Sequence, residues 1–133
     1  VMYRFERGLY AEPDQDLQQL RWGLVADYQG LKRPAGQGGA DWAAKIHIAT
    51  YPAYYHNYLL GELLASQLQA ALESGWADPT GRPYWENPET GPQLLRRIFR
   101  AGRRYPWGEL LARETGGSLS TRHYARQFVG SDR

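Results

Sequence analysis

Apolar residues recur along this chain at intervals of three and four positions, in segments separated by loops rich in proline and glycine. This spacing follows the turn of an α-helix, and no stretch alternates with the period of two that is typical of a β-strand. The first segment, with Met2, Phe5 and Leu9 at helical spacing, begins without a capping residue. The pattern predicts an all-α fold, a bundle-like subdomain of about five to six helices.

Capping residues, prolines and glycines set the expected helix ends. Asp14 or Asp16 is expected to cap the second helix, and Asp41 a short helix after a glycine-rich loop. Pro52 fits the first turn of the longest helix, which should end at Gly75. Counting the short segments, helical structure is predicted over residues 2–10, 14–28, 41–45, 52–75, 90–102 and 106–116, and in a last short helix capped by Ser120 or Thr121 that ends at Gly130.

The length of 133 residues is that of one domain. The chain starts at Val1 rather than Met, on a helix without a cap, so we expect residues 1–133 to be a single incomplete domain of a larger protein. No apolar run approaches the roughly 20 residues that span a bilayer, and no membrane partner is expected. The chain lacks cysteine, which excludes disulfides and thiolate metal sites and fits a cytoplasmic protein.

A basic cluster lies in the second half of the chain, although the formal net charge is only +2. Arginines at helical spacing are typical of a solvated face near a helix C-terminus, where cations oppose the dipole. Nucleic-acid binding and salt bridges to a missing part of the protein are the alternatives. We expect no nucleic-acid partner, because no recognised binding motif accompanies the cluster. The cluster consists of Arg96, Arg97, Arg100, Arg103 and Arg104.

Several catalytic motifs are absent from the sequence. There is no His-Glu-x-x-His pair of zinc ligands, no Gly-x-Ser-x-Gly elbow and no Walker lysine loop. The glycine run at residues 36–39 follows no predicted strand, which argues against a phosphate loop. The three histidines His47, His56 and His123 have no metal-ligand spacing, so no metal site is expected in this chain.

Residues 47–62 hold four tyrosines, two histidines and a carboxylate. On a helix, Tyr51, Tyr55, Tyr58 and Glu62 would fall at about 0°, 40°, 340° and 20°, which is one narrow stripe. A buried phenol needs a hydrogen-bond partner, so the stripe indicates either a polar ligand or hydroxyls that bond backbone or water. Tyrosine has an ordinary pKa near 10 and stays a neutral donor at pH 7, suited to an oxyanion.

His47 and the run Tyr55-His-Asn-Tyr58 resemble the C-terminal substrate-binding part of gluzincin metallopeptidases. The similar families are thimet oligopeptidase with oligoendopeptidase F, and peptidyl-dipeptidases of the angiotensin-converting enzyme type. The resemblance implies that Tyr58 is catalytic, as the donor to the tetrahedral intermediate, and that His47, Tyr51 and Tyr55 bind substrate. A shift of one residue would put Tyr54 in place of Tyr55, and His56, off the stripe, is expected to be structural.

The resemblance extends along most of the chain, through Arg4-Phe-Glu6, the segment from Gly91 to Gly102, and Tyr105-Pro-Trp107. It implies that the parent is a zinc-dependent oligopeptidase acting on peptide substrates. The zinc ligands and the general-base Glu would lie in a missing N-terminal part of the same polypeptide, so this chain alone should bind no zinc and be inactive. Endopeptidase and dipeptidase modes both stay open. The alternatives are a non-catalytic helical protein-interaction module and nucleic-acid binding through the Arg96–Arg104 cluster.

Overall fold

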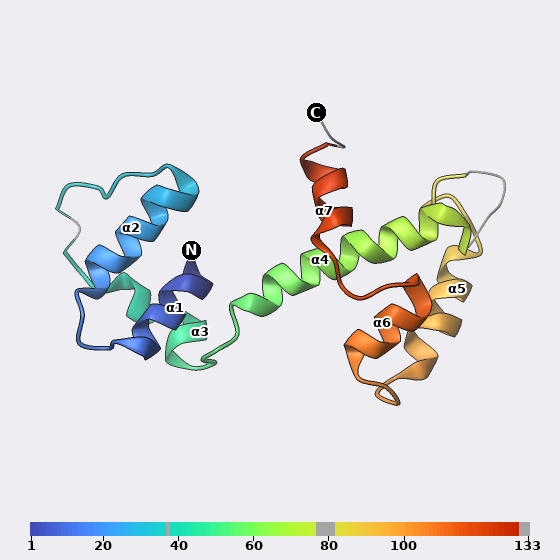
Figure 1. Cartoon of the computed structure of the whole chain (residues 1–133), viewed down its shortest axis with the longest axis horizontal. Coiled ribbons are helices and arrows are strands. Elements are labelled where there is room, and N and C mark those ends of the chain that lie inside the picture. The colour runs from blue at the N-terminus through green and yellow to red at the C-terminus, as the bar shows by residue number, and fades with distance from the viewer. Residues whose placement is uncertain (37, 77–81, 131–133) are drawn as a thin grey trace. The chain divides into compact units, whose positions relative to one another are not determined.

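The computed structural model describes residues 1–36, 38–76 and 82–130. These residues form seven α-helices and no strand, which confirms the predicted all-α class (Figure 1). The α-helices are α1 Met2–Ala11, α2 Leu17–Gln29, α3 Ile46–Ala49, α4 His56–Ala71, α5 Thr90–Arg97, α6 Trp107–Thr115 and α7 Thr121–Phe128. Short turns of other helix types are η1 Asp41–Ala44, η2 Leu72–Trp76 and η3 Phe99–Ala101.

Two compact units make up the chain: unit 1, residues 1–59, and unit 2, residues 60–133. The boundary falls within α4. The expectation of a single incomplete domain stays a prediction. No helix in the described ranges combines the length and apolarity that crossing a bilayer requires.

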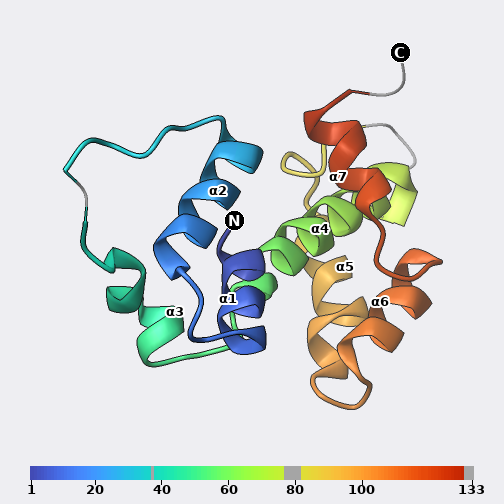
Figure 2. The ribbon, with the colours of Figure 1, turned by 60° about the vertical axis from the view of Figure 1, so that its left-hand side comes forward.

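Unit 1 is built on α1 and α2, which lie side by side in both views (Figures 1 and 2). Its core contains Phe5, which is fully buried, and Val25. The two helices approach closely at Gly8, where an added Cβ would meet the Leu20 side chain at 2.6 Å. A glycine at this position therefore lets α2 pack directly on the α1 backbone.

The start of α2 follows the predicted capping chemistry. The Asp16 side chain accepts a hydrogen bond from the Gln19 amide at 2.9 Å, and Gly30 ends the helix with φ of 65°. Asp41 does not cap, so that prediction was wrong: Ala40 precedes η1 and contributes no side-chain bond. The Asp41 carboxylate pairs instead with Arg21 of α2 at 2.5 Å, because a charged partner competes with the backbone for it.

Unit 2 contains the rest of α4, with α5, α6 and α7. Its apolar core includes Leu63, Ala71, Leu72 and Leu111. The amide of Gln67, 3% exposed, connects three elements. It donates to Thr115 Oγ1 at 2.8 Å and to the carbonyl oxygens of the following loop, and accepts from the Ser120 N–H at 3.0 Å. One buried side chain thus joins α4, the end of α6 and the start of α7.

Helix ends in unit 2 match the predicted signals in two cases and depart in two. The α-helix predicted to end at Gly75 ends at Ala71, and η2 follows it. Gly116 ends α6 at φ of 81°, and the Ser120 hydroxyl caps α7 by accepting from the Arg122 N–H. The helix predicted over residues 90–102 is shorter, because α5 ends at Arg97 and η3 follows up to the turn at Gly102. The predicted loop at residues 76–89 lies partly outside the described residues.

Candidate functional site

His47 on α3 is surrounded by the four tyrosines of residues 51–58. The Tyr54 ring stacks on the imidazole, with centroids 4.8 Å apart and planes at 19°. Tyr55 and Tyr58 meet it edge-on, each with a centroid distance of 5.3 Å, and Tyr51 lies at 6.4 Å. The structure therefore brings together all the residues predicted for the site, with Tyr54 as a further contact.

The predicted helical stripe is not what brings them together. Helix α4 begins at His56, not at Pro52, so Tyr51 and Tyr55 precede the helix that carries Tyr58. The prediction of one helix from Pro52 was wrong because Ala53 has a φ of 58°, in the left-handed region. That conformation breaks a right-handed helix. The tyrosines converge on His47 through the turn between α3 and α4.

A buried carboxylate holds this turn. Glu6 of α1 is 3% exposed and accepts a hydrogen bond from the Ala53 N–H. It also accepts one from the Tyr10 hydroxyl at 3.4 Å. Pattern reasoning did not assign Glu6 a role, although a signal was present. On a helix Glu6 falls within about 40° of Met2 and so inside the apolar stripe of α1, where a charged residue is unusual.

The His47 imidazole has one bonded and one unbonded nitrogen. Its Nε2 lies 2.6 Å from the Tyr58 hydroxyl oxygen, within hydrogen-bond distance. Its Nδ1 is buried and has no hydrogen-bond partner among the described residues. The proton on Nε2 belongs to one tautomer and to the cation, and in both forms His47 donates to Tyr58. In the other tautomer Tyr58 donates to His47.

The hydroxyl-bearing side of this cluster is accessible to solvent. Tyr58 is 57% exposed and Tyr51 59%, whereas Tyr55 is half-buried. Burial raises the pKa of Tyr55, and the neighbouring Tyr58 and Glu6 raise it further. Tyr55 is therefore a neutral hydrogen-bond donor at pH 7. His56, off the stripe, faces Tyr3 with a centroid distance of 6.1 Å instead.

The basic cluster is partly neutralised. Arg96 pairs with Glu89 at 3.4 Å, and Arg97 with Glu114 at 3.2 Å. Arg97 also lies over the Trp76 ring at 4.9 Å. Because α5 ends at Arg97, the arginines that follow do not continue one helical face.

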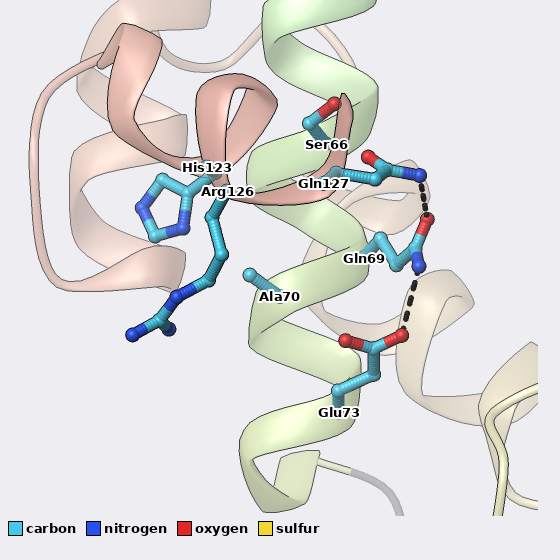
Figure 3. Close-up of a pocket in the computed structure, with 7 residues that line it drawn as sticks. All are labelled: Ser66, Gln69, Ala70, Glu73, His123, Arg126 and Gln127. Atoms are coloured by element: carbon cyan, nitrogen blue, oxygen red, sulfur yellow. Dashed lines mark hydrogen bonds between the residues drawn. The ribbon is translucent and has the colours of Figure 1, made fainter. Parts of the chain in front are cut away.

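A pocket lies between α4 and α7 in unit 2, with a volume of about 240 Å³ (Figure 3). Its amides bond one another in a chain, from Gln127 to Gln69 at 3.0 Å and from Gln69 to Glu73 at 2.8 Å. No buried polar atom of this lining lacks a partner in the part of the chain that is described. The pocket therefore differs from the His47 cluster, in which the buried Nδ1 of His47 has no hydrogen-bond partner among the described residues.

Comparisons with family models, curated proteins and solved structures gave no match to this chain. The described residues also contain no group of three His, Cys, Asp or Glu side chains that could hold a metal ion. A zinc ion therefore does not fit the residues of the His47 cluster themselves. What the cluster offers is a set of tyrosine hydroxyls beside the His47 imidazole, two of them on the exposed side chains of Tyr51 and Tyr58.

Proposed function

We propose that this chain is the substrate-binding side of a zinc-dependent oligopeptidase, as the residues around His47 and Tyr58 imply by resemblance. The observation that carries the proposal is the 2.6 Å contact between His47 Nε2 and the hydroxyl of the exposed Tyr58. The zinc would be held by the N-terminal part of the same polypeptide, and peptides would be the substrates. A cytoplasmic location belongs to the same proposal.

Tyr58 acts as the donor to the substrate oxygen. When His47 donates from Nε2 to the Tyr58 oxygen, the Tyr58 hydrogen stays free and points to a second acceptor. Hydrogen bonds in such a chain polarise one another, so His47 makes Tyr58 a stronger donor. The acceptor is the carbonyl oxygen of the scissile peptide, which gains negative charge in the transition state.

Tyr51 and Tyr55 bind the substrate beside that oxygen. Both lie on the turn that faces His47, and the half-buried Tyr55 stays protonated because its pKa is raised. Neutral phenols donate to peptide carbonyls without adding charge to the cleft. Binding of this kind orients the substrate, which accelerates the reaction by holding the reacting atoms in place.

The test is Tyr58→Phe in the full reading frame that contains this chain. Turnover of a fluorescence-quenched peptide should fall by about 10²–10³, the usual cost of losing one such donor. Tyr28→Phe is the matched control, because Tyr28 is 56% exposed and its ring contact with Arg4 survives the change. A Tyr58→Phe enzyme with full turnover would remove the assignment.

Two further measurements bear on the parent enzyme. The full reading frame should encode a His-Glu-x-x-His motif before Val1, and a frame without it would contradict the proposal. The isolated chain should not hydrolyse peptides. Chelator-sensitive cleavage by the purified 133-residue chain would contradict that expectation.

A further inference from the structure

Glu6 is a buried carboxylate in unit 1, and packing of the apolar core does not explain why a charged side chain lies there. It is 3% exposed and lies next to Phe5, which is fully buried. Burying a charge is unfavourable unless hydrogen bonds compensate for the lost water. The compensating groups are the Ala53 N–H and the Tyr10 hydroxyl. A carboxylate on α1 is thus used to hold a backbone amide 47 positions further along the chain.

Ala53 is the one non-glycine residue with positive φ in the described part of the chain, at 58°. For an L-residue this region costs about 1–2 kcal/mol. Such strain persists only where surrounding contacts enforce it, and it gathers at functional sites. Ala53 is exposed, so side-chain packing does not enforce it. Its backbone N–H donates to the buried Glu6 carboxylate, which is a contact able to enforce this conformation.

Ala53 directly precedes Tyr54 and Tyr55, two of the tyrosines whose rings contact His47. Tyr54 stacks on the imidazole at 4.8 Å and Tyr55 meets it at 81°. A change in φ at Ala53 rotates everything that follows it in the turn. The conformation of Ala53 therefore bears directly on the directions of both rings.

We propose that Glu6 is a positioning residue that holds Ala53 in the left-handed conformation and thereby sets Tyr54 and Tyr55 against His47. The geometric part of this proposal stands on unit 1 alone. Its consequence for catalysis rests on the proposed peptidase function. The tests below separate the two.

The first test is NMR of the 133-residue chain, with the His47 ring protons as the probe. A ring stacked on Tyr54 experiences a ring-current shift. Glu6→Ala should abolish this shift, and Glu6→Gln should keep it because the amide oxygen still accepts from the Ala53 N–H. In Glu6→Ala/Ala53→Gly the shift should return in part, since glycine adopts positive φ without a clash.

Ala53→Val probes the same geometry with Glu6 intact. A β-branched residue disfavours positive φ strongly, and position 53 is exposed, so the core is unaffected. The His47 ring-current shift should be lost here too, whether or not Glu6→Ala folds. An unchanged shift in Ala53→Val, or in folded Glu6→Ala, overturns the positioning role.

The second test is kinetic and uses the full-length parent. Glu6→Ala should lower kcat/KM by up to about 10²-fold, the effect of displacing site residues by about 1 Å. Glu6→Gln should stay near the parent value, and Ala53→Gly should recover part of the Glu6→Ala loss. The assays are run at temperatures where all variants are folded, so that a difference in stability does not change kcat/KM.

Failure of the two proposals gives different results. If the NMR shifts respond as expected while Tyr58→Phe keeps full turnover, the positioning role stands and the peptidase function falls. If Tyr58→Phe loses turnover while the His47 ring-current shift is the same in Glu6→Ala and Ala53→Val as in the unsubstituted chain, the peptidase function stands and the positioning role is wrong.

Discussion

Both units use a buried polar side chain on a helix to hold loop backbone. In unit 2, Gln67 is 3% exposed and bonds Thr115, the loop after it and the Ser120 N–H. In unit 1, Glu6 is also 3% exposed and bonds the Ala53 N–H. The difference is in the backbone that each one holds. Ser120 has an ordinary extended φ of −135°, whereas Ala53 is left-handed at 58°.

The two units also differ in their buried polar atoms that have no hydrogen-bond partner. The buried side-chain atoms without a partner among the described residues are Gln18 Oε1, Trp42 Nε1 and His47 Nδ1, all in unit 1. Native interiors satisfy most of their polar groups, so exceptions call for an explanation. Strain and an unpaired nitrogen coincide at the His47 cluster, where we place the function. The Gln67 network satisfies its members and serves as scaffold.

Replacing Gln67 should produce the largest change in stability. Gln67→Leu keeps the volume but removes the acceptor of the Ser120 N–H and the amide that donates to the Gly117 and Ser118 carbonyl oxygens. We expect a loss of about 2–3 kcal/mol in the free energy of unfolding. Urea denaturation followed by hydrogen exchange in α6 and α7 measures it.

Gln69→Leu, two residues along the same helix, is the control. Its amide bonds Gln127 and Glu73 at exposed positions, so the loss should stay below about 1 kcal/mol. Equal losses in the two variants would mean that Gln67 is not the special scaffold residue of unit 2.

Ala53→Gly should produce a smaller change of the opposite sign. Glycine avoids the cost of positive φ, and we expect unit 1 to gain about 1 kcal/mol, less the extra entropy of the unfolded chain. Ala26→Gly, at an exposed position in α2, should instead lose about 1 kcal/mol. If both variants lost stability equally in thermal unfolding, Ala53 would not be strained.

The smallest effect concerns alkaline pH and the ionisation of Tyr55. Burial, Tyr58 and Glu6 raise its pKa in the fold, so the unfolded chain releases the proton first. The stabilising contribution is complete below about pH 10, the unfolded value, and disappears as the pH rises through the folded pKa. As the pH rises from about 9 to 11, the Tyr55→Phe variant should therefore lose less free energy of unfolding than the unsubstituted 133-residue chain. Identical pH profiles in urea denaturation would contradict the shift.

Local signals in the sequence predicted several helix ends. Asp16, Gly116 and Ser120 act at the positions where their chemistry places them. The failures have a common cause. Asp41 pairs with Arg21, which is 20 residues away in the sequence, and Pro52 is followed by an alanine that a carboxylate of α1 holds out of the helix. Partners distant in sequence overrode local preference at both places.

For the candidate site, the sequence predicted the residues but not their arrangement. Its members, His47, Tyr51, Tyr55 and Tyr58, were predicted from their density and from the resemblance, because hydroxyls in a helical segment are unusual without a polar partner. Their arrangement was not predictable, since it depends on a turn rather than on a helix face. Tyr54, assigned only as an alternative to Tyr55, contacts His47 together with it.

The sequence by itself determined an all-α chain, its main caps and a cluster of tyrosines and histidine, because helical periodicity and capping are local properties. Only the tertiary structure decided that Glu6 would be buried and that Ala53 would be left-handed. It also decided that the tyrosines would surround His47. The physical reason is that a buried carboxylate requires hydrogen-bond donors, and the donor available in this fold is the backbone of a distant turn.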